Sequence, residues 1–348
     1  MTLAHVTERV LTLRELNRAT LARQLLLERK RLSPRAVIER LVGVQAQWPQ
    51  APYVGIWTRT ASFRRQQLER ELARGTVLKA TMMRQTLHLV TPRDYGLLRA
   101  AMSETNFLSE TSRAKQLAPS VRALATAGPL TTEEALAHLE REHGLTGTEA
   151  RYAWRGARIS AHVLHHHETA LWRGRPEGRF VAVAEPEEHV PLEARAEIVR
   201  RYLAAFGPAT RTDVAQWTGL TLASLEPAFA HTKLRRLRDD QGRELLDVAR
   251  APLPDADVPA APRFLPTWDS TLLAHVDRSR ILPDEYRKVV IRRNGDVQQT
   301  FLVDGFVAGL WQHVDGRIEL EPFEPLPARV RRELEREARA LAAFHSAT

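Results

Sequence analysis

The sequence predicts a mostly helical α+β fold, in which three similar units in tandem precede a smaller β-rich module. The order helix, turn, helix and two-stranded hairpin occurs three times, and this is the order of elements in a winged helix. Beyond residue 250 the pattern changes to a Pro/Ala-rich segment and then to strands and hairpins. We therefore expect domains at residues 1–125, 126–190, 191–250 and 251–348.

The first unit is expected to open with a helix over residues 13–28. A second helix begins at Ser33, which caps it, and the proline that follows suits a first turn. We expect this second helix to continue through residues 36–46. A third helix over residues 62–75 ends at a glycine, and residues 76–92 alternate in polarity like a pair of strands.

The second unit begins with a helix that Thr131 or Thr132 caps, because acidic residues follow these threonines. A second helical stretch is expected over residues 147–170. Residues 171–185 then read as a hairpin with a Gly/Pro-rich tip that carries arginines. These three elements complete the second winged-helix pattern.

The third unit consists of a helix over residues 195–208, a helical pair over residues 210–231 that turns at Gly219, and a hairpin over residues 233–250. Residues 251–262 are rich in proline and alanine and are expected to form a linker. In the last module, the dipeptides Asn-Gly at position 294 and Asp-Gly at position 304 predict hairpins, and an amphipathic helix over residues 327–345 is expected to close the chain.

Composition narrows the class of protein. The 348 residues contain 51 Lys and Arg against 42 Asp and Glu, a net charge of +9, which favours nucleic acid as the partner. There is no cysteine, which excludes disulfides and thiolate metal sites. The N-terminal residues lack the features of a secretory signal, and no apolar run reaches membrane-spanning length. We therefore expect a cytoplasmic protein that does not associate with membranes.

Two glutamines one residue apart, Gln45 and Gln47, follow the apolar run that starts at Leu41. If the chain is extended there, both side chains point to the same side. Each amide offers an acceptor oxygen and two donors but no useful base, so the pair can hold a water or direct its dipoles at a developing positive charge. The alternative is a pair of ordinary polar groups at a helix end.

The segments LVGVQAQWPQAPYVGIWTR, TMMRQTLHLVTPRDY, RFLPTWDSTLLAHVDRSRIL and FLVDGFVAGLW together resemble the winged-helix DNA glycosylases of the AlkZ and YcaQ type, over nearly the whole chain. The resemblance implies three tandem winged helices in a C-shaped array that binds DNA. The catalytic motif of the family is Gln-x-Gln in the AlkZ-like branch and Gln-x-Asp in the other. Gln45 and Gln47 match the first form, and the resemblance implies that they are catalytic.

The implied activity is that of a monofunctional glycosylase acting on cationic N7-alkylated purines in double-stranded DNA, including bulky adducts or interstrand crosslinks. No cofactor is expected, and several DNA contacts within one chain favour a monomer. No Schiff-base lysine stands near the motif, and Lys79 is the nearest by position. Two biological roles are compatible with this activity: general DNA repair, and self-resistance in an organism that produces a genotoxin. The alternatives are a non-catalytic winged-helix regulator and a protein-interaction scaffold.

Further candidates for the cleft or the DNA surface surround the motif. Trp48 follows Gln47 directly. Arg84 and His88 have the same parity in the expected strand pair, so they share a face that can meet phosphate or line the cleft. Asp269 can cap a helix that starts at the next residue or orient a group in the site.

Four arginines are the remaining candidates. Arg278 and Arg280 are expected to contact phosphate or to pair with Asp277, while Arg292 and Arg293 lie at a basic hairpin tip that can enter the minor groove. A plain surface hairpin is the alternative for the last two.

The histidines between positions 162 and 167 are not expected to bind metal. His162 and His166 have the spacing of a helical metal pair, but Val163 stands where a zincin has glutamate, and no third ligand is evident. A basic helix that faces DNA is the preferred interpretation.

Overall fold

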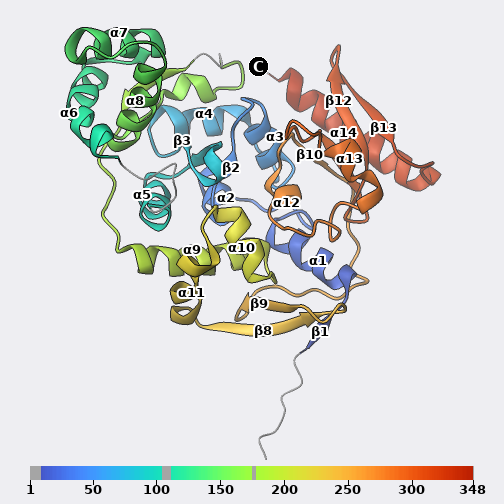
Figure 1. The fold of residues 1–348 in the computed structure, drawn as a ribbon. Coiled ribbons are helices and arrows are strands. Elements are labelled where there is room, and N and C mark those ends of the chain that lie inside the picture. The colour runs from blue at the N-terminus through green and yellow to red at the C-terminus, as the bar shows by residue number, and fades with distance from the viewer. Residues whose placement is uncertain (1–8, 104–110, 175–177, 348) are drawn as a thin grey trace, which may run out of the picture.

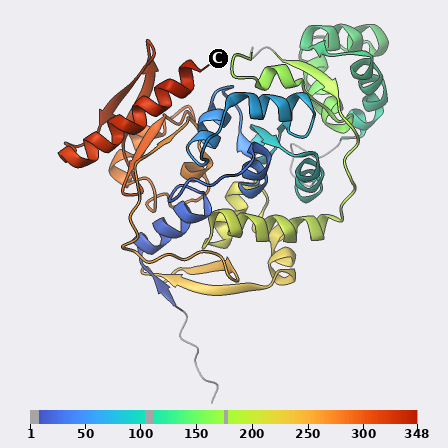
Figure 2. The ribbon, with the colours of Figure 1, turned by 180° about the vertical axis from the view of Figure 1, so that it is seen from behind.

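The structure is a computed structural model that describes residues 9–103, 111–174 and 178–347. Helices and short β-sheets alternate along this part, so the predicted α+β class is confirmed. In both views of the ribbon (Figures 1 and 2), the N-terminal elements lie centrally, between a helical group from the middle of the chain and the C-terminal elements. The division into tandem winged helices stays a prediction.

The first segment follows the predicted order with additions. Its elements are β1 (Val10–Leu11), α1 (Leu13–Arg23), α2 (Pro34–Arg40), β2 (Val44–Gln45), α3 (Ala51–Trp57), α4 (Arg65–Ala73), β3 (Leu78–Thr81), β4 (Leu87–Val90) and α5 (Pro92–Ala101). Ser33 caps α2 through Ala36 N, as predicted. A capping box between Thr12 and Glu15 starts α1. The predicted strand pair is the antiparallel hairpin of β3 and β4.

The predicted continuation of the second helix through residues 36–46 is wrong. The helix α2 ends at Arg40, because Val42 and Gly43 adopt positive φ values of 57° and 98° that no α-helix accommodates. The chain then enters the two-residue strand β2, which carries Gln45. The first glutamine of the motif therefore lies on a strand rather than at a helix end.

The second segment comprises α6 (Ser112–Ala127), β5 (Leu130–Thr131), α7 (Thr132–His143), α8 (Gly147–Ser160), β6 (Val163–His165) and β7 (Arg179–Ala182). Thr131 caps α7 in a capping box with Glu134, as predicted. The expected helix over residues 147–170 ends at Ser160, and His162 has a φ of 51° that turns the chain into β6. The predicted bounds of the hairpin are wrong, because β7 pairs with β6, which precedes residues 171–185. Part of the expected tip, residues 175–177, lies outside the described residues.

The third segment matches its predicted order. It contains α9 (Pro191–Phe206), α10 (Arg211–Thr218), α11 (Leu222–His231), β8 (Leu234–Asp239) and β9 (Glu244–Val248). Gly219 follows α10 and has left-handed backbone angles, which residues with a side chain rarely adopt. The hairpin of β8 and β9 gains β1 as a parallel third strand from the other end of the sequence.

The C-terminal segment is a four-stranded sheet with a closing helix. Its elements are β10 (Arg263–Leu265), α12 (Ser270–Leu273), α13 (Arg287–Val290), β11 (Thr300–Val303), β12 (Phe306–Val314), β13 (Arg317–Pro322) and α14 (Ala328–Ser346). The Asp-Gly pair at position 304 turns β11 into β12, and the Asn-Gly pair at position 294 lies in a turn closed by the bridge between Ile291 and Val297.

One sheet joins the first two segments. Its strand order is β2-β4-β3-β6-β7-β5, so the two hairpins lie edge to edge and β2 forms one outer edge. The contact between them is the antiparallel pairing of β3 with β6, where Lys79 opposes His165. The first glutamine thus stands at the end of a six-stranded platform.

The C-terminal helix completes the apolar core of the first segment. Phe344 of α14 lies against the rings of Trp57, Phe63 and Trp172, at centroid distances between 5.6 and 5.9 Å. The same buried cluster includes residues of α2, α3 and α4. The N-terminal segment and the last helix of the chain therefore share one core.

Residues 251–262, predicted as a linker, lie along α1 and are fastened to it. Arg14 and Arg18 of α1 donate to the carbonyl oxygens of Ala256 and Val258 at 2.8 and 2.6 Å. Arg23 donates to Pro252 O at 3.1 Å. The segment connects the third segment to the C-terminal sheet as a fixed strap.

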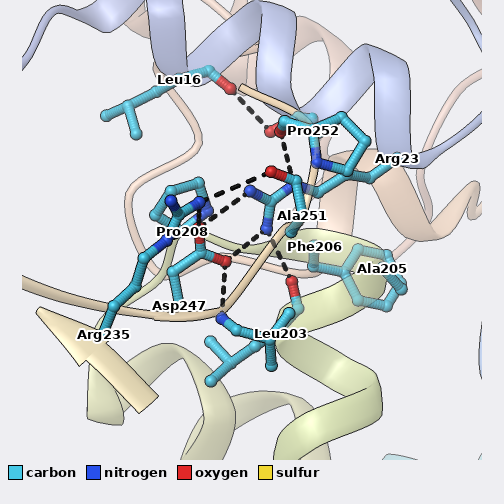
Figure 3. Close-up of polar contacts among 12 residues, drawn as sticks. Leu16, Arg23, Leu203, Ala205, Phe206, Pro208, Arg235, Asp247, Ala251 and Pro252 are labelled. Carbon is cyan, nitrogen blue, oxygen red and sulfur yellow. Dashed lines mark hydrogen bonds and ion pairs between the residues drawn. The ribbon is translucent and has the colours of Figure 1, made fainter. Parts of the chain in front are cut away.

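A buried charge cluster lies where the strap begins (Figure 3). Both Arg23 and Asp247 are fully buried, and their closest atoms, Nη1 and Oδ1, are 2.6 Å apart. Arg235 reaches the other carboxylate oxygen of Asp247 at 2.5 Å, and Arg23 also donates to Leu203 O at 2.8 Å. The cluster links α1, the end of α9 and the hairpin of β8 and β9.

Replacing Asp247 by Asn is expected to lower the free energy of unfolding by about 3–5 kcal/mol, because Arg23 would lose its buried counter-charge. Urea unfolding followed by circular dichroism measures this change. The matched control is Glu333→Gln, which removes an ion pair with Arg329, whose side chain is 87% exposed. That control should change the stability by less than about 1 kcal/mol. Equal effects of the two substitutions would contradict the structural role of the cluster.

Candidate active site

The Gln-x-Gln motif lies alongside the start of β4. Gln45 pairs with His88 in the antiparallel ladder of β2 and β4. Ala46 N donates to Leu87 O at 2.7 Å, and Leu87 N donates to the side-chain oxygen of Gln47 at 3.3 Å. The backbone of β4 therefore fixes the position of the first glutamine and also holds the side chain of the second.

The side chain of Gln45 is buried, with an exposed fraction of 6%. Its Oε1 is shielded from solvent, and no donor among the described residues reaches it. It lines a small cavity of about 10 Å³, close to the space that one water needs, together with Arg59, Asp269 and Trp268. A buried acceptor without a partner is costly, so this amide is poised to receive a donor from a molecule that enters.

The side chain of Gln47 is exposed and differs from Gln45 in what it offers. Its oxygen is occupied by Leu87 N, and nothing in the described part of the chain accepts from its Nε2. Two N–H donors therefore remain available. Gln45 thus presents an acceptor and Gln47 presents donors. Gln47 is not among the residues that line the small cavity beside Gln45.

Asp269 caps α12, as the sequence predicted, and is also part of a buried ion pair. Its Oδ1 accepts from Thr271 N at 2.9 Å. Both carboxylate oxygens accept from Arg59 at 2.8 Å, with both side chains almost fully buried. Burial alone would raise the pKa of Asp269, but the charge and hydrogen bonds of Arg59 hold it below the ordinary value. The carboxylate is committed to Arg59 and is not a free base.

His88 is buried in β4 and uncharged at neutral pH. Burial lowers the pKa of His88 to about 3, and the charge of Arg84 adds to the effect. Its Nδ1 lies 3.0 Å from Thr86 O, so that nitrogen carries the proton and donates to the carbonyl. His88 is therefore a neutral group behind Gln45.

The prediction that Arg84 and His88 share a strand face is wrong. Arg84 lies in the tight 3₁₀ turn Met83–Gln85 between β3 and β4, with a φ of 54°. Its Nη1 donates to Trp217 O of α10 at 2.8 Å, which directs the side chain toward the third segment. Arg84 thus ties two segments together.

The two arginines that follow Asp277 differ in burial and in their partners. Arg280 is buried and donates to Pro208 O at 2.8 Å, so the predicted phosphate contact is wrong for this residue. Asp277 forms its ion pair with Arg243 at 2.8 Å instead of with either predicted partner. Arg278 is half-buried.

Arg292 and Arg293 are exposed at the turn before Val297, in agreement with a basic hairpin tip. Trp48 is 53% exposed. Trp48 and Arg292 line the same larger cavity, of about 750 Å³. Trp48, which follows the motif, and the hairpin tip therefore face one space, although they lie far apart in the sequence.

Sequence reasoning missed Arg59 and Trp268. Arg59 follows the wholly buried helix α3, and an arginine at the end of such a run needs a buried counter-charge, which is a signal that could have pointed to the pair with Asp269. Trp268 has a φ of 54°, a conformation that a tryptophan rarely adopts and that the sequence does not signal.

Lys79 and the histidine cluster also have defined places. Lys79 is buried, burial lowers its pKa to about 8, and its Nζ donates to Thr169 O at 2.8 Å. The preferred interpretation of the histidines as a basic helix is wrong, because His165 lies on β6 and His166 follows it.

Within the described ranges, no three His, Asp or Glu side chains gather as a metal site. No described helix combines the length and apolar character of a membrane span.

Similarity to known proteins places the chain among the DNA glycosylases. The sequence model of the "DNA glycosylase AlkZ-like" family matches residues 38–344, and the chain belongs to that family. It is 29% identical to the interstrand DNA cross-link repair glycosylase of Streptomyces sahachiroi, over 91% of this chain and 93% of the relative. The solved structure of the Streptomyces sahachiroi DNA glycosylase AlkZ superposes with a TM-score of 0.81 at 25% identity, covering 97% of both chains. Because this family consists of enzymes, the alternative predictions of a non-catalytic regulator and of a protein-interaction scaffold are wrong.

The low pKa of His88 predicts a pH-dependent stability. Its folded pKa of about 3 lies below the ordinary 6.5, so the unfolded chain binds more protons in this window. The stability that neutral His88 provides is complete above about pH 6.5 and is lost as the pH falls toward 3, with a slope of about 1.4 kcal/mol per pH unit. Urea unfolding between pH 6.5 and 4.5 should show a slope smaller by about this amount in His88→Asn than in the wild type. Identical slopes would contradict the burial of a neutral imidazole.

Proposed function

We propose that the chain is a monofunctional DNA glycosylase that hydrolyses the N-glycosidic bond of cationic N7-alkylated purines, with Gln45 and Gln47 holding the attacking water. The observation that carries the proposal is the buried, unpartnered Oε1 of Gln45 beside a cavity of about 10 Å³. A lone buried acceptor next to a space the size of one water is what a water-positioning group requires.

The chemistry of the substrate explains why two amides suffice. A purine alkylated at N7 carries a fixed positive charge, so breaking the bond between C1′ and N9 sends the electron pair to N9 and releases a neutral base. No general acid is needed for this leaving group. The sugar becomes oxocarbenium-like, water oxygen bonds to C1′, and the surplus proton passes to solvent. An unmodified purine is a poor leaving group, and this protects normal DNA.

The two glutamines have different parts in this proposal. Gln45 Oε1 accepts a hydrogen bond from the water and directs its negative dipole end toward the cationic sugar. The free N–H donors of Gln47 hold the water from the other side, while Leu87 N keeps that side chain in place. Because β4 fixes both residues, the water is oriented before the bond breaks.

The neighbouring titratable groups support hydrolysis without acid–base catalysis. Asp269 is bound on both oxygens by Arg59, and His88 is neutral with its Nδ1 proton engaged by Thr86 O. Asp269 is therefore not free to exchange a proton with a substrate, and the low pKa of His88 makes it a weak base. Arg59 balances the charge of Asp269, so the site carries no uncompensated cation that would oppose a cationic lesion.

We extend the substrate class to bulky adducts and interstrand crosslinks. The Streptomyces sahachiroi relative is named an interstrand DNA cross-link repair glycosylase. A crosslink that joins N7 atoms of purines on opposite strands is released from one strand when one glycosidic bond is hydrolysed. A single chain suffices for this reaction, and we propose that the protein acts as a monomer.

The test of the proposal uses a DNA duplex with one N7-methylguanine, followed by alkaline cleavage at the abasic site. Gln45→Ala and Gln47→Ala should each lower the rate of base release at least about 100-fold, because each loses a preorganised group. Gln50→Ala, which changes the same residue type three positions later, is the matched control and should retain activity. Full activity of folded Gln45→Ala would reject the proposed role.

The monofunctional assignment makes a separate prediction about Lys79. Its Nζ is buried and donates to Thr169 O, so it cannot reach an abasic sugar. Borohydride added during the reaction should trap no covalent complex between the wild-type protein and DNA. A trapped complex that disappears in Lys79→Met would overturn the assignment and identify a lyase.

A further inference from the structure

The small cavity beside Gln45 adjoins the larger cavity of about 750 Å³, because Thr267 and Trp268 line both. A volume of this size falls in the range of small-molecule sites. The smaller cavity has room for a water only, so any bulky part of a lesion must lie elsewhere. Trp48, directly after Gln47, forms another part of the larger wall.

Trp268 is held rigidly at the boundary between the two cavities. Its backbone has a φ of 54°, a costly conformation for a tryptophan. The indole Nε1 donates to Gly295 O at 3.1 Å, and the next residue, Asp269, is locked by Arg59. A strained aromatic residue fixed at the wall of a cavity presents a flat surface at little entropic cost to whatever binds there.

The charge of the larger cavity is opposite to that of the whole protein. Asp296, Glu319 and Glu321 line it, against one arginine, Arg292. Glu319 and Glu321 are two residues apart on β13, and such positions face the same side of a strand. Carboxylates repel DNA phosphates, so this cavity suits a neutral or cationic group instead of the DNA backbone.

We propose that the larger cavity receives the N7 substituent of a bulky lesion and selects for a flat, apolar substituent with a positive charge or hydrogen-bond donors at its outer end. Trp48 and Trp268 contact the flat part, and Glu319 and Glu321 attract the positive end. This inference rests on the proposed excision of N7-alkylpurines. It adds a specificity site that recognises the adduct and takes no part in bond cleavage.

The experiment compares four duplexes that each contain one N7-substituted guanine: methyl, benzyl, 4-(aminomethyl)benzyl and 4-carboxybenzyl. Release of each free base is followed by chromatography, and the rate without enzyme is subtracted. For the wild type, kcat/KM should rise from methyl to benzyl to aminomethylbenzyl. The carboxybenzyl lesion should be released about tenfold less efficiently than the aminomethylbenzyl lesion, because its charge is repelled.

Variants locate the effect in the cavity. Trp48→Ala should lower the ratio of kcat/KM for benzyl over methyl about tenfold, and Trp48→Phe should restore most of it, because a flat ring returns. Glu321→Gln should reduce the preference for the aminomethyl group over the carboxyl group. Glu335→Gln, an exposed position on α14 with the same change of charge, is the matched control and should keep the wild-type preference.

Two further results separate the inference from the proposed function. If the wild type releases N7-methylguanine but is indifferent to the substituent, the specificity site is wrong and the glycosylase proposal stands. The same holds if Trp48→Ala slows methyl and benzyl lesions equally, since the cavity would then hold the base itself. If no lesion is released by the folded wild type, both fall.

Discussion

The buried ion pair of Arg59 and Asp269 is the constraint on which the site depends. Arg59 follows α3, close to the Gln-x-Gln motif in sequence, and Asp269 starts α12 some two hundred residues later. Two parallel hydrogen bonds between planar groups fix their relative orientation as well as their distance. The pair thereby places the strained Trp268 and the strand of Gln45 around a common space, although they come from opposite halves of the chain.

Several arginines stabilise the fold, although the net positive charge suggests that arginines bind DNA. Arg18, Arg23, Arg195 and Arg280 are buried and donate to backbone carbonyl oxygens of distant segments. A guanidinium offers five donors in a fixed plane, so it can satisfy several carbonyl groups where two segments meet. Part of the positive charge therefore holds the fold together and is not available to DNA. Arguments from composition treat every arginine as exposed, and here that assumption fails.

Local chemistry explains which elements the sequence could predict. Ser33 and Thr131 are caps whose hydrogen bonds lie within three residues, and Gly219 meets a turn that disfavours other residues. These signals need no knowledge of the rest of the chain. The strand β2 carries no such signal, because its two residues are extended only through pairing with β4.

In the candidate site too, the features set by neighbouring residues could be predicted and those set by distant contacts could not. Asp269 was predicted as a cap from its neighbours, and the cap is present. Its ion pair with Arg59, the buried position of Arg280 and the turn at Arg84 all depend on contacts between distant segments. Such contacts cannot be deduced from one sequence by periodicity or capping. The roles of Gln45 and Gln47 come from the family motif and stay a prediction, which the geometry of the cavity supports for Gln45 alone.

The position of Phe344 has a consequence for how the protein is made. The ring of Phe344 packs against Trp57, Phe63 and Trp172, so these three rings stay partly uncovered until α14 has been synthesised and has docked. A ribosome adds about 5–20 residues per second, which leaves those aromatic rings uncovered for many seconds of synthesis. The core of the first segment therefore closes only once α14, from the other end of the described chain, packs against these rings.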